Sequence, residues 1–132
     1  MEYEPKVSVI VPIYNVEDYI SESVVSLMKQ SYSNFEVIMI NDGSTDSSLN
    51  IVKKLIKNDD RFILRSTVNM GQSHARNIGL KMARGEFIAF LDPDDTYEND
   101  FLKRGIEEFD DKTDIAISHL YGSFQYHFKF NK

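Results

Sequence analysis

Short runs of apolar and β-branched residues alternate with amphipathic segments along the chain, and this alternation limits the folds that the sequence can adopt. Most of the runs are apolar throughout, which is typical of a parallel sheet that is buried on both faces. Predicted strands cover Val7–Val11, Phe35–Ile40, Phe62–Ser66, Glu86–Leu91 and Asp114–Ser118.

The segments between these runs have the periodicity of helices that cover such a sheet. In the first segment, Ile20, Val24 and Leu27 recur at helical spacing, and Gly85 ends the third. The predicted helices cover residues 17–29, 46–57, 73–84 and 98–109. The β-α-β-α-β-α-β-α-β order predicts an α/β fold with an open, mostly parallel, doubly wound sheet and helices on both faces.

A length of 132 residues suits one domain with one core. We expect residues 1–5 to form a flexible tail and residues 6–118 to form the α/β domain. In residues 119–132, Phe124, Tyr126, Phe128 and Phe130 alternate with polar residues, which predicts a half-buried strand. Because no partner strand follows it, we expect this segment to begin a further layer of a longer protein.

Composition excludes several classes of function. The chain carries 21 acidic and 15 basic residues, and its net charge of −6 opposes binding to nucleic acid. The absence of cysteine excludes disulfides and thiolate zinc sites. The apolar runs are far shorter than the roughly 20 residues of a membrane span, and the first residues lack the pattern of a secretory signal. We therefore expect no transmembrane segment and a cytoplasmic location.

Polar and acidic residues follow the predicted strands. The segments are PIYN after the first strand, NDGSTDS after the second, VNMGQSHAR after the third and DPDD after the fourth. Ligands of open α/β sheets bind beyond the carboxyl ends of the strands, where helix N-termini also point. The sequence therefore predicts a binding site at this edge.

The DPDD segment has two interpretations. Asp92 and Asp94 have the spacing of carboxylates that hold Mg²⁺ or Mn²⁺, and Pro93 stiffens the turn between them. Alternatively, Asp94, Asp95 or Thr96 caps the helix that follows.

Asp42, in NDGSTDS, also has two interpretations. Asp-Gly is turn chemistry, and Ser44, Thr45 and Asp46 are natural helix caps. A carboxylate at the end of a strand can instead accept the N3–H of uracil or thymine, whereas cytosine and adenine present an acceptor at the corresponding position. Guanine, with its N1–H, is not excluded.

Two further side chains are candidates for the same site. Arg76 lies in the first turns of the third helix, where it either contacts a base carbonyl or a phosphate or forms an ordinary surface ion pair. Tyr14 follows the first strand and either packs on a base or belongs to the core.

The segments VSVIVPIYNVEDYI, FEVIMINDGSTDSS, NMGQSHARNIGL and GEFIAFLDPDDTYEND together closely resemble the nucleotide-binding half of family 2 glycosyltransferases. These are inverting enzymes with the A-type fold of nucleotide-diphospho-sugar transferases. The resemblance covers Lys6 to about Ser118.

This resemblance implies a nucleotide site. It assigns Asp42 to base recognition, with Pro12 and Tyr14 lining the same pocket. Arg76 matches the arginine of the ARNxG segment near the nucleotide, and Asp92 matches the first acid of the DxD motif, which faces the ribose.

The resemblance also implies a metal cofactor, Mn²⁺ or Mg²⁺. Asp94 matches the acid that holds the metal bridging the diphosphate, and Asp95 would lie behind that ligand or face the sugar. The acids would be tolerated side by side because a cation and a diphosphate share the site.

The implied reaction is transfer from a UDP-sugar, in preference to a dTDP- or GDP-sugar, to a hydroxyl of a glycan or lipid-linked acceptor. The expected setting is polysaccharide or cell-envelope glycan synthesis in the cytoplasm, at the inner face of the membrane, with any membrane association made through regions outside this chain. The family places its general base well beyond the DxD motif, and none can be assigned before Lys132. We therefore expect residues 119–132 to begin an acceptor-side segment and the chain to bind a donor without transferring it.

Parts of the sequence also match other classes of protein. FIAFLDPDDT also matches the D-x-D-x-T start of haloacid dehalogenase-like phosphatases, but those place it on their first strand. A dinucleotide-binding dehydrogenase needs a glycine-rich first turn, and PIYNVED has none. A noncatalytic nucleotide-binding module remains the alternative to a glycosyltransferase.

Overall fold

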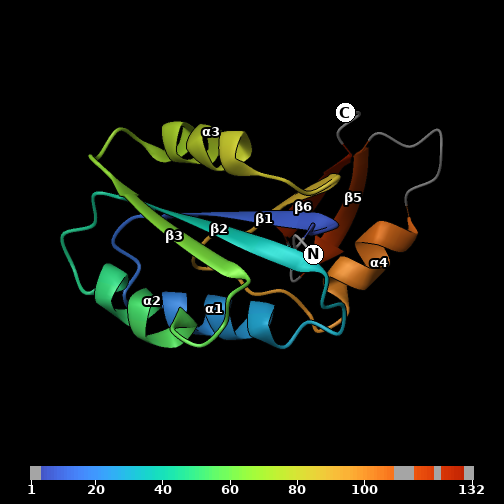
Figure 1. Cartoon of the computed structure of the whole chain (residues 1–132), viewed down its shortest axis with the longest axis horizontal. Helices are drawn as coiled ribbons and strands as arrows, with labels where there is room; N and C mark the ends of the chain where they lie inside the picture. The colour runs from blue at the N-terminus through green and yellow to red at the C-terminus, as the bar shows by residue number, and fades with distance from the viewer. Residues whose placement is uncertain (1–3, 109–114, 121–122, 130–132) are drawn as a thin grey trace.

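The computed structural model describes residues 4–108, 115–120 and 123–129, and it shows one six-stranded sheet with helices on both faces (Figure 1). The strand order is β3-β2-β1-β4-β6-β5. The strands are β1 Val7–Ile13, β2 Phe35–Asp42, β3 Phe62–Thr67, β4 Phe87–Phe90, β5 Ile115–Leu120 and β6 Ser123–Lys129.

Strands β1 to β4 form the parallel part of the sheet. β1 lies between β2 and β4, with Val7 opposite both Phe35 and Phe87, and β3 pairs with the outer side of β2. Parallel strands in this register end at one edge, so the loops after β1, β2 and β4 begin side by side. The predicted doubly wound, mostly parallel α/β fold is confirmed.

The chain joins the sheet at Lys6, the first residue of the predicted domain. Lys6 donates its backbone N–H to Asn34 and accepts that of Phe87, both at 3.0 Å, and Pro5 is already buried. Residues 1–3 of the predicted tail lie outside the described residues.

The last two strands differ from the prediction. β6 inserts between β4 and β5 and is antiparallel to both, so it extends the sheet instead of beginning a further layer. The boundary predicted at residue 118 falls within β5. An unpaired edge of β4 would expose backbone N–H and C=O groups, and β6 satisfies them. Asp114 and Phe130 of the predicted strands lie outside the described residues.

Helices α1 and α2 cover one face of the sheet, and α3 covers the other (Figure 1). Most begin two or three residues later than predicted, because the preceding loops use those residues as turns. Among the described residues, no helix is long and apolar enough to cross a membrane. The helices are α1 Ile20–Met28, α2 Ser48–Ile56, α3 Gln72–Met82 and α4 Phe101–Glu107.

The two faces of the sheet have unequal cores. The larger core packs α1, α2 and the start of α4 against alternate residues of β1 and β2, with Val52 of α2 fully buried. In α2, the partly buried Ile51, Leu55 and Ile56 also pack on this core. On the opposite face, α3 buries Ala75 against Ile38 and Ile40.

A buried carboxylate fixes the connection from α3 to β4. Glu36 is 0% exposed and accepts hydrogen bonds from the Ser8 hydroxyl at 2.6 Å and from the Arg84 backbone N–H at 2.8 Å. The Arg84 guanidinium adds an ion pair at 3.0 Å, and Gly85 donates its N–H to Ser8. This network lies at the edge of the sheet opposite the predicted site, because Ser8 and Glu36 are at the amino ends of their strands.

We expect Glu36→Gln to lower the free energy of unfolding by about 1.5–3 kcal/mol, the range for hydrogen bonds to a charged group. The amide would turn a donor toward Ser8 and Arg84, which already donate. Urea denaturation followed by circular dichroism measures the loss. Glu107→Gln, at an exposed position of α4, should change stability by less than about 0.5 kcal/mol. Equal stability of the Glu36 variant and the unmodified chain would contradict the proposed role of this network.

Candidate functional site

A pocket of about 520 Å³ lies at the carboxyl edge of the parallel strands. The ends of β1 and β2 form part of its wall, and the β3–α3 and β4–α4 loops form the rest. It is lined by Pro12, Ile13, Tyr14, Val16, Asp42, Asn69, Gly71, Gln72, Asp92, Pro93 and Asp94. The structure thus brings together five of the predicted site residues: Pro12, Tyr14, Asp42, Asp92 and Asp94.

Asp42, the last residue of β2, is 3% exposed and joins two walls of the pocket. Its carboxylate accepts the backbone N–H of Met70 at 2.9 Å and of Gly71 at 3.0 Å. A carboxylate offers about four lone-pair positions, so both oxygens can accept further hydrogen bonds. Asp42 therefore holds the β3–α3 loop and still presents acceptors to a ligand.

Glycine allows the β2–α2 and β3–α3 loops to approach each other closely. Gly43 has φ +70°, and a Cβ at this position would lie 2.8 Å from the backbone nitrogen of Asn69. Gly71 has φ +99° and precedes the first residue of α3. Larger residues at these positions would strain the backbone or push the loops apart.

Asn15 fastens the loop after β1 to the loop after β2. It adopts a left-handed conformation, φ 49°, and its Oδ1 accepts the backbone N–H of Thr45 at 2.8 Å and of Asp46 at 3.3 Å. Asp46 in turn accepts the N–H of Ser48 at 2.9 Å, which forms a turn before α2, whereas the N-cap residue Ser47 makes no side-chain cap bond. The turn interpretation thus holds for Asp46 and for Gly43, and the Asp42 carboxylate in addition bonds the β3–α3 loop.

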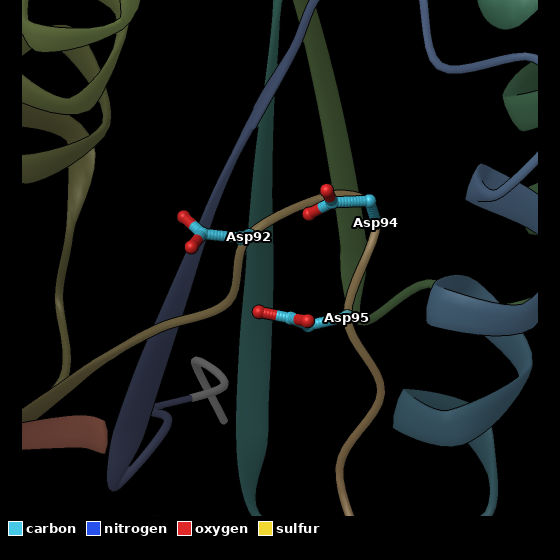
Figure 2. A group of neighbouring side chains, drawn as sticks. All are labelled: Asp92, Asp94 and Asp95. Carbon is cyan, nitrogen blue, oxygen red and sulfur yellow. The ribbon is translucent and has the colours of Figure 1, made fainter. Parts of the chain in front are cut away.

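The three acids of the β4–α4 loop gather at one point. One oxygen from each of Asp92, Asp94 and Asp95 lies within 4.8 Å of the others. Figure 2 shows all three on the loop that leaves β4, with the carboxylates of Asp94 and Asp95 directed toward the side on which Asp92 lies. The alternative in which Asp94, Asp95 or Thr96 caps the next helix is wrong, because α4 begins only at Phe101.

The electrostatics of these acids are unfavourable without a cation. Partial burial, then the charges of Asp94 and Asp92, raise the pKa of Asp95 above its ordinary value of 3.8. Beneath them, burial and then the charges of Asp92 and Asp95 raise the pKa of Tyr97, whose hydroxyl donates to the Phe90 carbonyl. Three carboxylates form a hard oxygen donor set, which fits Mg²⁺ or Mn²⁺.

Arg76 of α3 forms an ion pair with Asp92, with Nη2 and Oδ1 2.8 Å apart. Arg76 thus forms the ion pair that one of its two interpretations predicted. The ion pair lies at the edge of the pocket, because Asp92 is a lining residue. Tyr14 is 46% exposed, so the alternative that assigned it to the core is wrong. Asp95 and Arg76 do not line the pocket themselves.

Sequence reasoning missed several residues of the site. Asn69 and Gln72 line the pocket, but an asparagine in a loop and a glutamine at the start of a helix are common, so the sequence gives no sign of a role in binding. Asn15 stood in the quoted PIYN segment, where asparagine before an acidic helix start is a signal for a left-handed turn.

Comparison with known proteins places the chain in a family. The model of the family described as "Glycosyl transferase family 2" matches residues 8–132. An uncharacterized glycosyltransferase of Haemophilus influenzae is 46% identical over 101 residues, which are 76% of this chain and 40% of that protein. The putative glycosyltransferase EpsH of Bacillus subtilis is 40% identical over 92% of this chain and 35% of its own length. The chain thus spans well under half the length of either relative.

Solved structures agree. The structure of S. aureus TarS 1–349 in complex with UDP-GlcNAc has a TM-score of 0.75 and 40% identity, covering 83% of this chain and 33% of that chain. The mannosyltransferase PcManGT of Pyrobaculum calidifontis has a TM-score of 0.82 over 96% of this chain and 45% of its own, at 24% identity, which shows the fold alone.

We expect Asp95→Asn to stabilise the metal-free chain at pH 7. A pKa raised by folding means that the unfolded chain binds fewer protons than the native one above about pH 3.8, so ionisation of Asp95 lowers stability as pH rises through that window. Thermal unfolding in EDTA should give a higher Tm for the variant at pH 7, and the difference should shrink as the pH falls toward 4. A lower Tm for the variant at pH 7 would contradict the repulsion among these acids.

Proposed function

Because this chain belongs to glycosyl transferase family 2, we propose that it is the donor-binding part of an inverting, metal-dependent glycosyltransferase that uses a UDP-sugar. The observation that carries the proposal is a single pocket with Asp42 on one wall and Asp92 and Asp94 on another. A nucleoside diphosphate has a base at one end and a charged diphosphate at the other, and these two ends match the two walls of the pocket.

The base end is assigned to Asp42. Its carboxylate is buried, held in place by two backbone N–H groups, and lies in the pocket near Pro12 and Tyr14. Uracil N3–H is a donor that this acceptor can bind, and the exposed ring of Tyr14 offers a surface for stacking. Two forms of S. aureus TarS, solved with UDP and with UDP-GlcNAc, support uridine as the base because both are 40% identical to this chain.

The diphosphate end is assigned to the acidic loop, which is the part of the β4–α4 loop that carries Asp92, Asp94 and Asp95. Asp94 is the most exposed of the three acids and would hold the cation, while Arg76 fixes Asp92 on the ribose side. When bound, a divalent cation would offset the negative charge of the departing diphosphate. Asp95 is assigned a place beside that ligand, and its backbone N–H donates to the Asp92 carbonyl at 2.9 Å in a turn.

In the complete reaction an acceptor hydroxyl attacks the anomeric carbon from the face opposite the diphosphate. Its proton passes to a general base, the new C–O bond forms, and the bond to the diphosphate breaks to release UDP. None of the described residues that line the pocket is assigned as that base. The proposed acceptor is a glycan or a lipid-linked hydroxyl at the cytoplasmic face of a membrane, as in cell-envelope glycan synthesis.

We predict that the chain binds UDP more tightly than CDP by one to two orders of magnitude, since a hydrogen bond to a charged group contributes about 1.5–3 kcal/mol. Asp42→Asn should remove most of this preference. Isothermal titration calorimetry with both nucleotides and Mn²⁺ measures the ratio.

The ratio is the informative quantity, because Asp42 also holds Met70 and Gly71. A displaced β3–α3 loop would weaken UDP and CDP alike and leave the ratio unchanged. Equal affinities of the unmodified chain for UDP and CDP would remove Asp42 from base recognition.

We also predict that Asp94→Asn abolishes the Mn²⁺-dependent part of UDP binding while circular dichroism shows an intact fold. The substitution keeps the shape of the side chain and removes its charge. Asp60→Asn provides the control, because this exposed acid precedes β3 at the opposite edge of the sheet. If Mn²⁺ still enhances UDP binding to the Asp94 variant, the metal site lies elsewhere.

A further inference from the structure

Helix α1 and the turn that follows it bury three polar side chains on the face that meets the β4–α4 segment. Ser23 is 1% exposed, and Ser26 and Gln30 are each 8% exposed. Ser23 and Ser26 are three residues apart on one side of α1, and Gln30 lies two residues beyond the last residue of the helix. Buried polar side chains need partners, and all three find partners in the segment between β4 and α4 or at the start of α4.

Ser23 holds the acidic loop directly. Its hydroxyl donates to the backbone carbonyl of Pro93 at 2.7 Å and also lies within hydrogen-bonding distance of the carbonyl of Asp95. These two carbonyls flank Asp94, the acid assigned to the metal. One side chain of α1 therefore fixes the backbone on both sides of that residue.

Ser26 and Gln30 continue the attachment toward α4. The Ser26 hydroxyl accepts the Tyr97 N–H at 3.2 Å. The Gln30 amide donates to the Glu98 carbonyl at 2.6 Å and accepts the Leu102 N–H at 3.1 Å. Residues 93–100 contain no helix or strand, so these side chains take the place of a backbone ladder.

The acids give this attachment a role beyond stability. Asp92, Asp94 and Asp95 repel one another, and a loop free to move would spread them apart. A cation binds best where the ligands are already held together, because less ordering is then required on binding. The backbone that carries Asp94 is held by Ser23, whereas Gln30 acts four or more residues farther along the chain.

We propose that Ser23 is a positioning residue of the metal site, which sets the spacing of the three carboxylates through the backbone of Pro93 and Asp95. The inference rests on the proposed function, because it assigns the metal to Asp94. Ser26 and Gln30 mainly stabilise the segment that follows.

The test compares Ser23→Ala with Gln30→Met and with Ser8→Ala. Ser8 is an equally buried serine at the opposite edge of the sheet, where it bonds Glu36 and Gly85. Binding of Mn²⁺ alone is measured by the electron paramagnetic resonance of the free ion, binding of UDP with and without Mn²⁺ by calorimetry, and stability by urea denaturation.

We expect Ser23→Ala to weaken Mn²⁺ binding and Mn²⁺-dependent UDP binding about tenfold, roughly the effect of one lost hydrogen bond, and to leave metal-free UDP binding unchanged. Gln30→Met should lose more stability yet less metal affinity, and Ser8→Ala should lose stability alone. Ser23→Cys, a weaker donor of similar size, should fall between Ser23→Ala and the unmodified chain, and it carries the test if Ser23→Ala does not fold.

Metal affinity that simply follows stability across these variants would overturn the proposal, as would a Ser23→Ala variant that binds Mn²⁺ like the unmodified chain. If the unmodified chain binds Mn²⁺ but not UDP, the proposed donor fails and the positioning role of Ser23 is still decided by the Mn²⁺ measurements. If it binds neither, both proposals fail.

Discussion

The carboxyl edge of the sheet depends on how its loops satisfy their own backbone groups. Parallel strands end side by side at this edge, and the loops that follow them have no neighbouring strand to pair their backbone N–H and C=O groups. In each case a polar side chain from another element supplies the partner. Asn15 bonds the β2–α2 loop, Asp42 bonds the β3–α3 loop, and Ser23 of α1 bonds the β4–α4 loop. The pocket is the space that these cross-connected loops enclose, and its walls are therefore fixed relative to one another.

Charge gives this rigid edge its chemical character. The described part of the edge concentrates carboxylates on one wall, and Arg76 offsets only Asp92 among them. The pKa of Asp95 is raised, first by partial burial and then by the nearby charges of Asp94 and Asp92. Clustered carboxylates lower the stability of the chain when no cation is bound. The same carboxylates favour binding of a cation together with an anionic ligand. At the other edge of the sheet the situation is reversed, because the buried Glu36 carboxylate accepts from Ser8 and pairs with Arg84 within the chain itself.

Much of this account could be read from the sequence. The apolar runs predicted the parallel strands, and the DPDD and NDGSTDS segments located the edge where Asp42 and Asp94 now share a pocket. Three features were not predictable from local pattern. The place of β6 depends on pairing with β4, which periodicity does not encode. The bonds of Ser23 depend on which segment packs against α1, and a serine in a helix gives no such signal. The partner of Arg76 in its ion pair, Asp92, could not be predicted, because it depends on where α3 lies over the sheet.

The central claim is that one pocket binds a uridine diphosphate group through Asp42 and a cation held at Asp94. The most direct test is a crystal structure of this chain grown with UDP and Mn²⁺. The account predicts uracil N3–H within hydrogen-bonding distance of the Asp42 carboxylate, and anomalous density for manganese between the Asp94 carboxylate and the diphosphate oxygens. A nucleotide bound with its base away from Asp42, or manganese bound without Asp94, would contradict it.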